Sequence, residues 1–400
     1  MITKLHIENF KCLRDVTVEL QPLTVLIGKN DTGKTSFLEA LGMLGDLANG
    51  RATPLLQHNG FDNVLSRGAE KRQIAWDATI APSPRIPLPG QASYRLAFSV
   101  DRLGLVVREE QLSIEGSDTR ITRAADGQGA TLREDGKDHG FGGNFRDVVV
   151  LASIKNNSVL PASNAVAAAL ATTPPYRFDA QRLTTPGSFN PGPANPGEFP
   201  RLESDGLGLP TVLDYLLGTR RKVFDQIERE LCDAVPQVKG ILVTPAPNGA
   251  APGSKAISFE LAGGHTIPAS FASDGVLFLL AYLILIHAPG APAVIRLEEP
   301  ENGIHPRQLE RIAGYLKRLT DPVGRAANTA QIVVATHSPY FLDFVPSESV
   351  IVFGRRENGE TVTAPLVALP GVKERIASGF SLGEMWFNVG EDELLADLLK

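Results

Sequence analysis

The sequence predicts an α/β fold in which a parallel sheet carries a phosphate-binding loop. Three largely apolar segments, Leu23–Ile27, 293–297 and 331–335, have the length and composition of strands that are buried on both faces. The glycine-rich segment 28–35 follows the first of them, and residues 35–47 then place apolar side chains at helical spacing. A strand, a glycine-rich turn and a helix in this order begin an α/β unit.

The composition is that of a folded protein without a strong positive charge. The 400 residues are 43% hydrophobic and 21% charged, which excludes disorder of the whole chain. The net charge of −6 argues against a uniformly basic nucleic-acid binder, although a local basic patch would still allow contact with DNA.

Cysteine content and apolar runs predict a cytoplasmic protein that does not enter a membrane. Cys12 and Cys232 are too few for a disulfide framework or a zinc cluster, and they suit a reducing compartment. The longest apolar run, residues 276–286, is about half of a membrane span. The N-terminal residues alternate in polarity like a strand and do not resemble a signal peptide.

The first 150 residues combine the phosphate-loop unit with an expected antiparallel region. Segments 3–9 and 16–20 alternate as strands before the loop. Further strands, separated by Pro- and Gly-rich turns, are expected at residues 73–80, 92–100 and 103–114. Residues 116–146 are polar and glycine-rich, which predicts a mobile loop, and residues 148–152 are expected to form another strand.

The rest of the chain predicts an insert followed by a second α/β region. Between predicted helices at 161–171 and 211–235, residues 186–210 contain six prolines and five glycines, which predicts a surface loop or a linker. The later elements are expected to be strands at 240–244, 256–261, 293–297, 331–335 and 350–353, and helices at 276–287 and 307–319. We therefore expect an N-terminal lobe (1–150), an insert (151–255) and a C-terminal lobe (256–400).

Residues 28–35 match the phosphate-binding pattern G-x-x-x-x-G-K-[ST]. Glycines let backbone N–H groups turn toward phosphate oxygens, and the following helix presents its positive N-terminal end. Lys34 would reach the β- and γ-phosphates, and the Thr35 hydroxyl would bind Mg²⁺. Residue frequencies produce this pattern by accident in on the order of one chain in a hundred of this length. The predicted nucleotide-binding residues of the loop are Gly28, Asn30, Asp31, Thr32, Gly33, Lys34 and Thr35.

Two glutamates, Glu298 and Glu299, follow the predicted strand 293–297. In P-loop NTPases a carboxylate at the end of a neighbouring buried strand holds Mg²⁺. Glu298 stands at that position and would hold the metal, and Glu299 would polarise the attacking water. The alternative is a cluster of acids at a helix start, which leaves the strand and the paired glutamates unexplained. Arg296 interrupts the apolar run, and the sequence offers no reason for it.

Several segments resemble the RecF/OLD/SMC-like branch of the ABC-type ATPases. Residues 297–306, Leu-Glu-Glu-Pro-Glu-Asn-Gly-Ile-His-Pro, are similar to the acidic-strand motif of that branch. The segment Ala-Ser-Asp-Gly at 272–275 resembles its signature loop, and Ala-Thr-His-Ser-Pro at 335–339 resembles its switch-histidine motif. Residues 7–13 resemble its first strand and turn, and residues 381–386 are similar to a C-terminal stretch of stand-alone bacterial members. The motifs stand in the order of the family.

The resemblance implies that two heads pair head-to-tail around two ATP molecules. The γ-phosphate bound by one head would then contact the signature of the other, formed by Ser273, Asp274 and Gly275. His337 would contact the γ-phosphate and act with Glu299 in catalysis. The Ser273 segment also suits the N-cap of the helix that follows, and this role is compatible with the first.

Two further residues are candidates for contact with the nucleotide. Lys11 follows the first strand and could touch phosphate from its own head; the alternative is a solvated lysine. Gln181 is the candidate for the glutamine that links Mg²⁺ to the lid, and the alternative is an ordinary surface residue.

Other members of the wider ABC class fit less well. Asp274 stands where transporter ATPases carry glycine, which argues against a transporter motor. The 63 residues after His337 are too few for the nuclease domain of the OLD enzymes, and they contain no Asp-x-Asp pair. The 237 residues between Thr35 and Ser273 show no heptad run of the length that a coiled-coil arm requires.

The sequence therefore predicts an ATPase that uses ATP and Mg²⁺ and pairs its heads in DNA maintenance or in defence against foreign DNA. A separate effector protein is the expected partner, contact with DNA is left open, and fold-level analogy carries this last step. The alternative is a nucleotide-gated sensor that holds an effector inactive with little or no hydrolysis.

Overall fold

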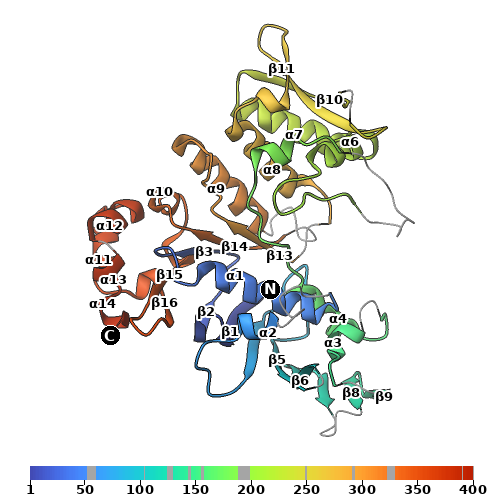
Figure 1. The fold of residues 1–400 in the computed structure, drawn as a ribbon, viewed down its shortest axis with the longest axis vertical. Helices are drawn as coiled ribbons and strands as arrows, with labels where there is room; N and C mark the ends of the chain where they lie inside the picture. Colours follow the sequence, from blue (N-terminus) through green and yellow to red (C-terminus); the bar gives the residue numbers. More distant parts are fainter. Residues whose placement is uncertain are drawn as a thin grey trace. The chain divides into compact units, whose positions relative to one another are not determined.

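The computed structural model describes residues 1–51, 60–102, 104–123, 129–142, 146–154, 157–187, 199–247, 250–290, 293–321, 329–389 and 391–399 (Figure 1). The chain forms two compact units. Unit 1 comprises Met1–Thr173, Pro292–Arg296 and Thr320–Lys400, and unit 2 comprises Pro174–Ala291 and Leu297–Leu319. The boundaries expected at 150 and 255 do not coincide with those of the compact units, because the chain returns to unit 1 twice after residue 173.

A five-stranded sheet contains the strand that precedes the phosphate loop. Its strand order is β13 (Val294–Glu298), β14 (Gln331–Thr336), β3 (Leu23–Ile27), β15 (Val350–Arg355) and β16 (Thr361–Pro365). β3 pairs in parallel with both β14 and β15, and β16 adds an antiparallel edge. Every residue of β3 and β14 is buried, which confirms the prediction of strands covered on both faces.

The second sheet of unit 1 has eight strands. Their order is β2 (Leu13–Glu19), β1 (Ile2–Phe10), β4 (Gln73–Ile80), β5 (Ala92–Asp101), β6 (Gly104–Ile114), β7 (Arg120–Arg123), β8 (Gly129–Glu134) and β9 (Lys137–Gly142), and the neighbours are antiparallel. The early strands agree with the sequence-based prediction. The mobile loop expected at 116–146 is wrong for the described residues, because Ile121, Ala130 and Leu132 bury their side chains in β7 and β8.

Helix α1 (Lys34–Ala48) packs against β1 of one sheet and β14 of the other. Its Phe37 ring meets Phe353 of β15 edge-on, with 5.9 Å between the ring centroids. α2 (Gly60–Val64) and α4 (Pro161–Leu170) also belong to unit 1, and α4 confirms the helix expected at 161–171.

The strand expected at 148–152 is wrong, since the chain forms the short helix α3 (Val150–Ser153) there. The Glu110 carboxylate accepts hydrogen bonds from the N–H groups of Val150 and Leu151 at 2.8 and 2.9 Å. This buried acceptor satisfies donors that the first turn of a helix leaves unpaired. Glu110 reaches them from β6, which a local pattern does not reveal.

The C-terminal part of unit 1 is built of short helices (Figure 1, red). They are α10 (Pro339–Leu342), α11 (Val372–Ala377), α12 (Leu382–Val389), α13 (Glu391–Leu394) and α14 (Ala396–Leu399), with single 3₁₀ turns at Ser347–Ser349 and Leu366–Ala368. α10 packs against α12, and α14 packs against β15.

Unit 2 combines helices with a three-stranded antiparallel sheet of β10 (Val238–Pro245), β11 (Lys255–Leu261) and β12 (Thr266–Pro268). Its helices are α5 (Ala180–Thr184), α6 (Leu209–Thr219), α7 (Arg221–Ala234), α8 (Asp274–His287) and α9 (Pro306–Thr320), with a 3₁₀ turn at Ala269–Phe271. α8 packs against α7 and is buried along most of its length. Among the described helices, none combines the length and the apolar composition needed to cross a membrane.

Two predictions for unit 2 have different outcomes. The single helix expected at 211–235 is wrong, because the backbone of Arg220 leaves the helical region (φ −137°) and separates α6 from α7. The Pro- and Gly-rich segment 186–210 lies partly outside the described residues, from 188 to 198. Residues 199–208 form no helix or strand, and Leu209 and Pro210 begin α6.

Candidate nucleotide-binding site

The phosphate loop joins β3 to α1 and has the tight backbone that its glycines predict. A Cβ atom at Gly28 would lie 2.2 Å from the carbonyl oxygen of Phe353, so another residue does not fit there. Gly33 adopts a φ of +104°, and a Cβ there would lie 2.5 Å from Thr361 Oγ1. α1 begins at the next residue, so its N-terminal N–H groups continue the loop, as an anion site requires.

Lys34 and Thr32 bond back to the carbonyl groups of the loop. Lys34 Nζ donates to the carbonyl oxygens of Gly28 at 2.6 Å and Lys29 at 2.7 Å, which holds the ammonium against the loop. Thr32 Oγ1 also donates to the Lys29 carbonyl at 2.9 Å. An ammonium, a helix N-terminus and a glycine backbone without room for side chains form a donor set that fits a nucleotide phosphate.

The hairpin β15–β16 supports the loop through residues that sequence reasoning missed. Thr361 Oγ1 donates to the Thr32 carbonyl at 2.9 Å, and the Thr361 N–H donates to the Cys12 carbonyl at 3.1 Å. Arg355 donates to the carbonyl of Asp31 at 2.9 Å and also pairs with its carboxylate. Both residues lie more than 300 positions after the loop, and no motif spacing in the sequence signals them.

The strand register brings His337 and the phosphate loop to the same sheet edge. In the parallel pair β3–β14, Ile27 is the partner of Thr336. The next residues are Gly28, the first residue of the loop, and His337, whose side chain is exposed. Because parallel strands end at one edge, the loop and the histidine begin side by side.

Lys11 and Arg296 each contact α1. Lys11 has a positive φ of 51°, and its ammonium forms an ion pair with Glu39 of α1. Arg296 is 5% exposed; it donates to the Leu38 carbonyl and, at 2.6 Å, to the Thr173 carbonyl. Burial lowers the pKa of its guanidinium to about 10, so it stays charged at neutral pH. The interruption of the apolar strand is therefore a buried link between β13 and the backbone of α1.

The acidic pair lies in unit 2, at the end of β13. The N–H of Glu298 donates to the Tyr176 carbonyl at 2.9 Å, so the end of β13 is hydrogen-bonded to the segment around Tyr176. Glu299 has a φ of +48°, and its carbonyl accepts from the N–H of Asn302 at 3.0 Å, so it begins a turn. The Glu299 carboxylate pairs with Arg177 and accepts from the Asn302 amide, and neither partner was anticipated from the sequence.

The signature segment forms the start of α8, also in unit 2. Ser273 is the N-cap by position, and its carbonyl accepts from the Val276 N–H at 3.0 Å. This confirms the expected N-cap position, although the Ser273 hydroxyl makes no capping hydrogen bond. Asp274 is exposed in the first turn, and a Cβ at Gly275 would lie 3.3 Å from Gln308 Oε1. Gln181 is exposed on α5, four positions after Arg177.

A different cluster, on β1 and β4, has the residue types of a metal site. His6, Glu8 and Asp77 hold ligand atoms close to one another. The hydrogen bond that the His6 ring donates to the Asp77 carboxylate raises the pKa of His6 to about 9, and an imidazolium has no lone pair for a metal. Arg95 also pairs with Asp77 and, at 3.2 Å, with Glu8. These charges form an ion-pair network rather than a metal centre.

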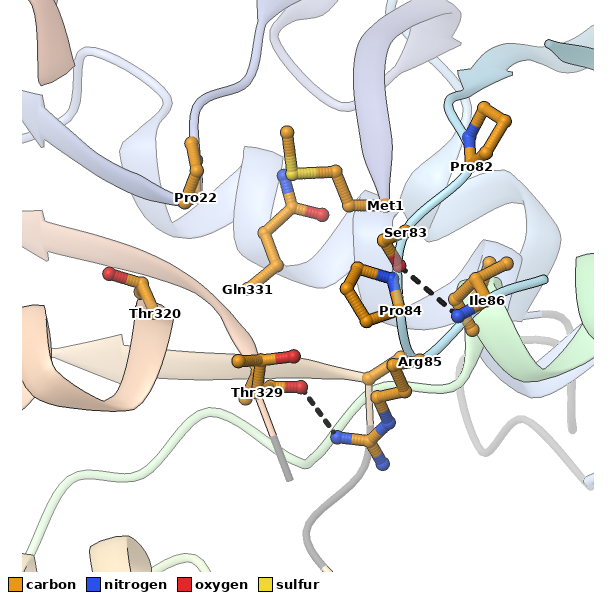
Figure 2. Close-up of a pocket in the computed structure, with 13 residues that line it drawn as sticks. Met1, Pro22, Pro82, Ser83, Pro84, Arg85, Ile86, Thr320, Thr329 and Gln331 are labelled. Atoms are coloured by element: carbon orange, nitrogen blue, oxygen red, sulfur yellow. Dashed lines mark hydrogen bonds between the residues drawn. The ribbon is translucent and has the colours of Figure 1, made fainter. Parts of the chain in front are cut away.

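A cavity of about 230 Å³ lies in unit 1 beside the N-terminus (Figure 2). Its wall is mainly apolar and includes Met1, Pro22 and Ile86. Arg85 donates to the Thr329 carbonyl at 2.9 Å at this cavity. None of the described residues that line it belongs to the phosphate loop, so the cavity is separate from the candidate nucleotide site.

Sequence comparisons match two separate segments of the chain to models of AAA ATPase families. The family model described as "AAA ATPase domain" matches residues 1–75, and the model described as "AAA domain, putative AbiEii toxin, Type IV TA system" matches residues 189–343. The OLD nuclease of Thermus scotoductus is 44% identical over 48 residues, which are 12% of this chain and 9% of that protein. The DNA replication and repair protein RecF of a Synechococcus species is 40% identical over 73 residues, 18% of this chain and 17% of that protein. The matches thus span less than a fifth of these two relatives.

Two solved structures share the fold over nearly their whole length. An Smc head bound to the C-winged helix domain of ScpA has a TM-score of 0.53 at 13% identity, covering 92% of this chain and 98% of that one. An Smc head domain from Pyrococcus furiosus, with an extended coiled coil and bound to the C-terminal domain of ScpA, has a TM-score of 0.50 at 12% identity, covering 94% and 99%. Identities this low show the fold alone. Together with the family matches and the two short matches to relatives, the shared fold supports the resemblance of this chain to RecF/OLD/SMC-like ATPases of the ABC type.

Proposed function

We propose that this protein binds and hydrolyses ATP, and that ATP-dependent pairing of two heads acts in DNA maintenance or in defence against foreign DNA. The observation that supports the proposal most is the pairing of Ile27 with Thr336. It starts the phosphate loop and His337 at one edge of a parallel sheet, where α/β proteins bind nucleotides. A histidine at this edge is suited to contact the γ-phosphate of a nucleotide held by the loop.

The residues of the loop provide the chemistry for ATP and Mg²⁺. ATP would lie against the N–H groups of residues 28–35, with the Lys34 ammonium on its β- and γ-phosphates. The Thr35 hydroxyl and the Glu298 carboxylate would hold Mg²⁺, which prefers oxygen ligands. The ion would neutralise the charge that develops on the phosphate oxygens during transfer.

Glu299 would orient and polarise the water that attacks the γ-phosphate, and His337 would contact the phosphate that leaves. Ser273 and the start of α8 would complete the site of a second head, because a helix N-terminus stabilises an anion. The exposed hydroxyl of Ser273 makes no capping hydrogen bond within its own helix, and this favours a role toward a partner head.

The biological setting is proposed from relatives. Among the curated proteins that match, one is a nuclease and one is a DNA replication and repair protein, which favours a process on DNA. The description of one family model names a toxin–antitoxin system, which favours an interaction with a separate effector protein. We therefore propose DNA and an effector protein as partners, in the cytoplasm.

The experiment compares ATP turnover, with and without DNA, in the wild type and in Glu299→Gln. The variant should bind ATP with unchanged affinity and lose turnover, because glutamine keeps the shape of the side chain but lacks the charge. Light scattering should show an ATP-dependent pair of heads that lasts longer in the variant. Glu310→Gln, an exposed acid on α9, is the matched control and should turn over like the wild type.

Two results would change the proposal. Loss of turnover in Glu298→Gln but not in Glu299→Gln would mean that the roles of the two acids are exchanged. A wild type that pairs its heads with ATP but does not hydrolyse it would identify a nucleotide-gated sensor of an effector instead of an enzyme.

A further inference from the structure

The carboxylate of Glu299 is held by two donors that come from different segments of unit 2. Arg177 Nη2 lies 3.0 Å from Glu299 Oε2 in an ion pair. Asn302 Nδ2 donates to the same oxygen at 2.6 Å. Both donors therefore converge on one oxygen, which fixes the direction of the carboxylate plane. The Glu299 side chain is 24% exposed, so water can still reach it.

The backbone of Glu299 limits its side chain further. A non-glycine residue with a φ of +48° lies in the left-handed region, which is uncommon and is found mostly where the surroundings enforce it. The Asn302 N–H donates to the Glu299 carbonyl at 3.0 Å, so Glu299 stands at the start of a turn. This conformation ends β13 and sets the direction in which the side chain leaves the strand.

The segment that carries Arg177 is anchored on three sides. The Tyr176 carbonyl accepts from the Glu298 N–H at 2.9 Å, so the segment runs beside the end of β13. The Arg177 N–H donates to the Ser204 carbonyl at 2.9 Å. The Phe178 ring packs edge-on against Tyr282 of α8, with 5.2 Å between centroids. Arg177 thus extends from a fixed backbone directly beside the acid that it contacts.

We propose that Arg177 is a positioning residue for Glu299 in ATP hydrolysis. Its guanidinium, together with the Asn302 amide, keeps the carboxylate in the orientation in which it polarises the attacking water. A general base loses rate steeply when its geometry loosens, because the reacting atoms no longer meet in an aligned arrangement. The inference rests on the proposed function, since it requires Glu299 to be the residue that acts on water.

The exposure of the Arg177 side chain distinguishes a positioning role from a purely structural role. The Arg177 side chain is 61% exposed, and exposed ion pairs contribute little to folding. Removal of its charge should therefore leave the stability of the protein nearly unchanged while it slows the chemical step. A residue that only supports the fold would show the opposite pattern.

The test measures kcat, the KM for ATP and the melting temperature of Arg177→Gln in the full chain. We expect kcat to fall about tenfold or more, with KM within about twofold of the wild type and an unchanged melting temperature. Arg177→Lys keeps the positive charge and N–H donors but lacks the planar guanidinium, so it should recover part of the lost kcat. Arg182→Gln is the matched control, because Arg182 lies on the next helix and pairs with Asp205 at 2.7 Å instead of Glu299; its kcat should equal that of the wild type.

A double variant completes the test. The residual hydrolysis rate of Glu299→Gln, measured in a single turnover, should not fall further when Arg177→Gln is combined with it, because both changes remove the same action on water. If Glu299→Gln is inactive and Arg177→Gln has the wild-type kcat, or a raised KM alone, the positioning role is overturned and the proposed function stands. If Glu299→Gln turns over normally, or the wild type shows no turnover, the proposed function fails and the inference fails with it.

Discussion

Ile27 and Thr336 are partners in the neighbouring parallel strands β3 and β14, although 309 positions separate them in the chain. Each is the last residue of its strand, so the phosphate loop and His337 begin at the same edge of the sheet. The adjacent strand β15 pairs Val352 with Ile27, and the next residue of that strand, Phe353, closes the space beside Gly28. The loop is therefore enclosed by strands from the far end of the sequence.

Lys34→Ala should abolish ATP binding or weaken it severely. The ammonium is the charged donor of the loop and is held against the carbonyls of Gly28 and Lys29. Loss of a charge-assisted contact to phosphate should cost about 2 kcal/mol or more, which is roughly 30-fold or more in affinity. Titration calorimetry measures the affinity, and Lys373→Ala, which changes an exposed lysine of α11, is the control and should bind ATP like the wild type. Unchanged affinity in a folded Lys34→Ala protein would contradict the phosphate-loop assignment.

Ser273→Arg should still bind ATP through its own loop but should not pair with another head. A bulky cation at the start of α8 would replace the small hydroxyl that is proposed to face the partner's nucleotide. Light scattering of Glu299→Gln with ATP should show pairs of heads. The double variant that carries both Glu299→Gln and Ser273→Arg should show none. Because the hydroxyl makes no capping bond, Ser273→Ala should fold with the stability of the wild type. Pairs that persist in Ser273→Arg would leave the residue without a role between heads.

Gly42→Ala should destabilise unit 1, because the new methyl group would lie 1.8 Å from Arg296 Nη1. The guanidinium would have to leave its carbonyl partners inside the protein, and displacement of a buried charge costs about 3 kcal/mol or more. Gly314→Ala is the matched control, since apart from the adjoining residues and backbone of α9 itself nothing lies within 4 Å of its Cβ position. There alanine should stabilise the protein by about 1 kcal/mol through helix propensity. Urea unfolding measures both, and equal effects of the same sign would contradict the packing described for Arg296.

The His6 network should make stability depend on pH above neutrality. Chiefly through the hydrogen bond with Asp77, the folded protein raises the pKa of His6 from 6.5 to about 9. The folded state therefore binds the proton more tightly than the unfolded state. This stabilisation is complete below about pH 6.5 and is lost as the pH rises through about 9.

The measurement is the free energy of unfolding at pH 6.5 and at pH 9.5 in the wild type and in His6→Gln. Glutamine can donate a hydrogen bond but does not titrate in this range. The wild type should lose more stability between the two values than the variant does. Equal losses would show that other groups cause the dependence.

Local patterns predicted most of the regular elements. The segments of β3 and β14 are recognised because strands buried on both faces must be apolar throughout, and Gly28 and Gly33 are recognised because side chains do not fit beside a phosphate-binding backbone. The predictions for 116–146 and 148–152 were wrong because local patterns carry too little information in these two segments. Short strands between glycines carry a weak pattern, and the partner that starts α3, Glu110, comes from a distant strand.

The sequence by itself determined the chemistry: an ammonium and a hydroxyl in a glycine loop, two acids after an apolar strand, and a histidine after another. These follow from residue type and spacing over a few positions, which local backbone geometry translates directly into structure. Only the tertiary structure decided which groups support them. Arg355 on Asp31, Arg296 beside Gly42 and Arg177 on Glu299 are contacts between residues more than 100 positions apart. Strand register and helix packing create such contacts, and long flexible side chains complete them, so no pattern along one segment of the chain can encode them.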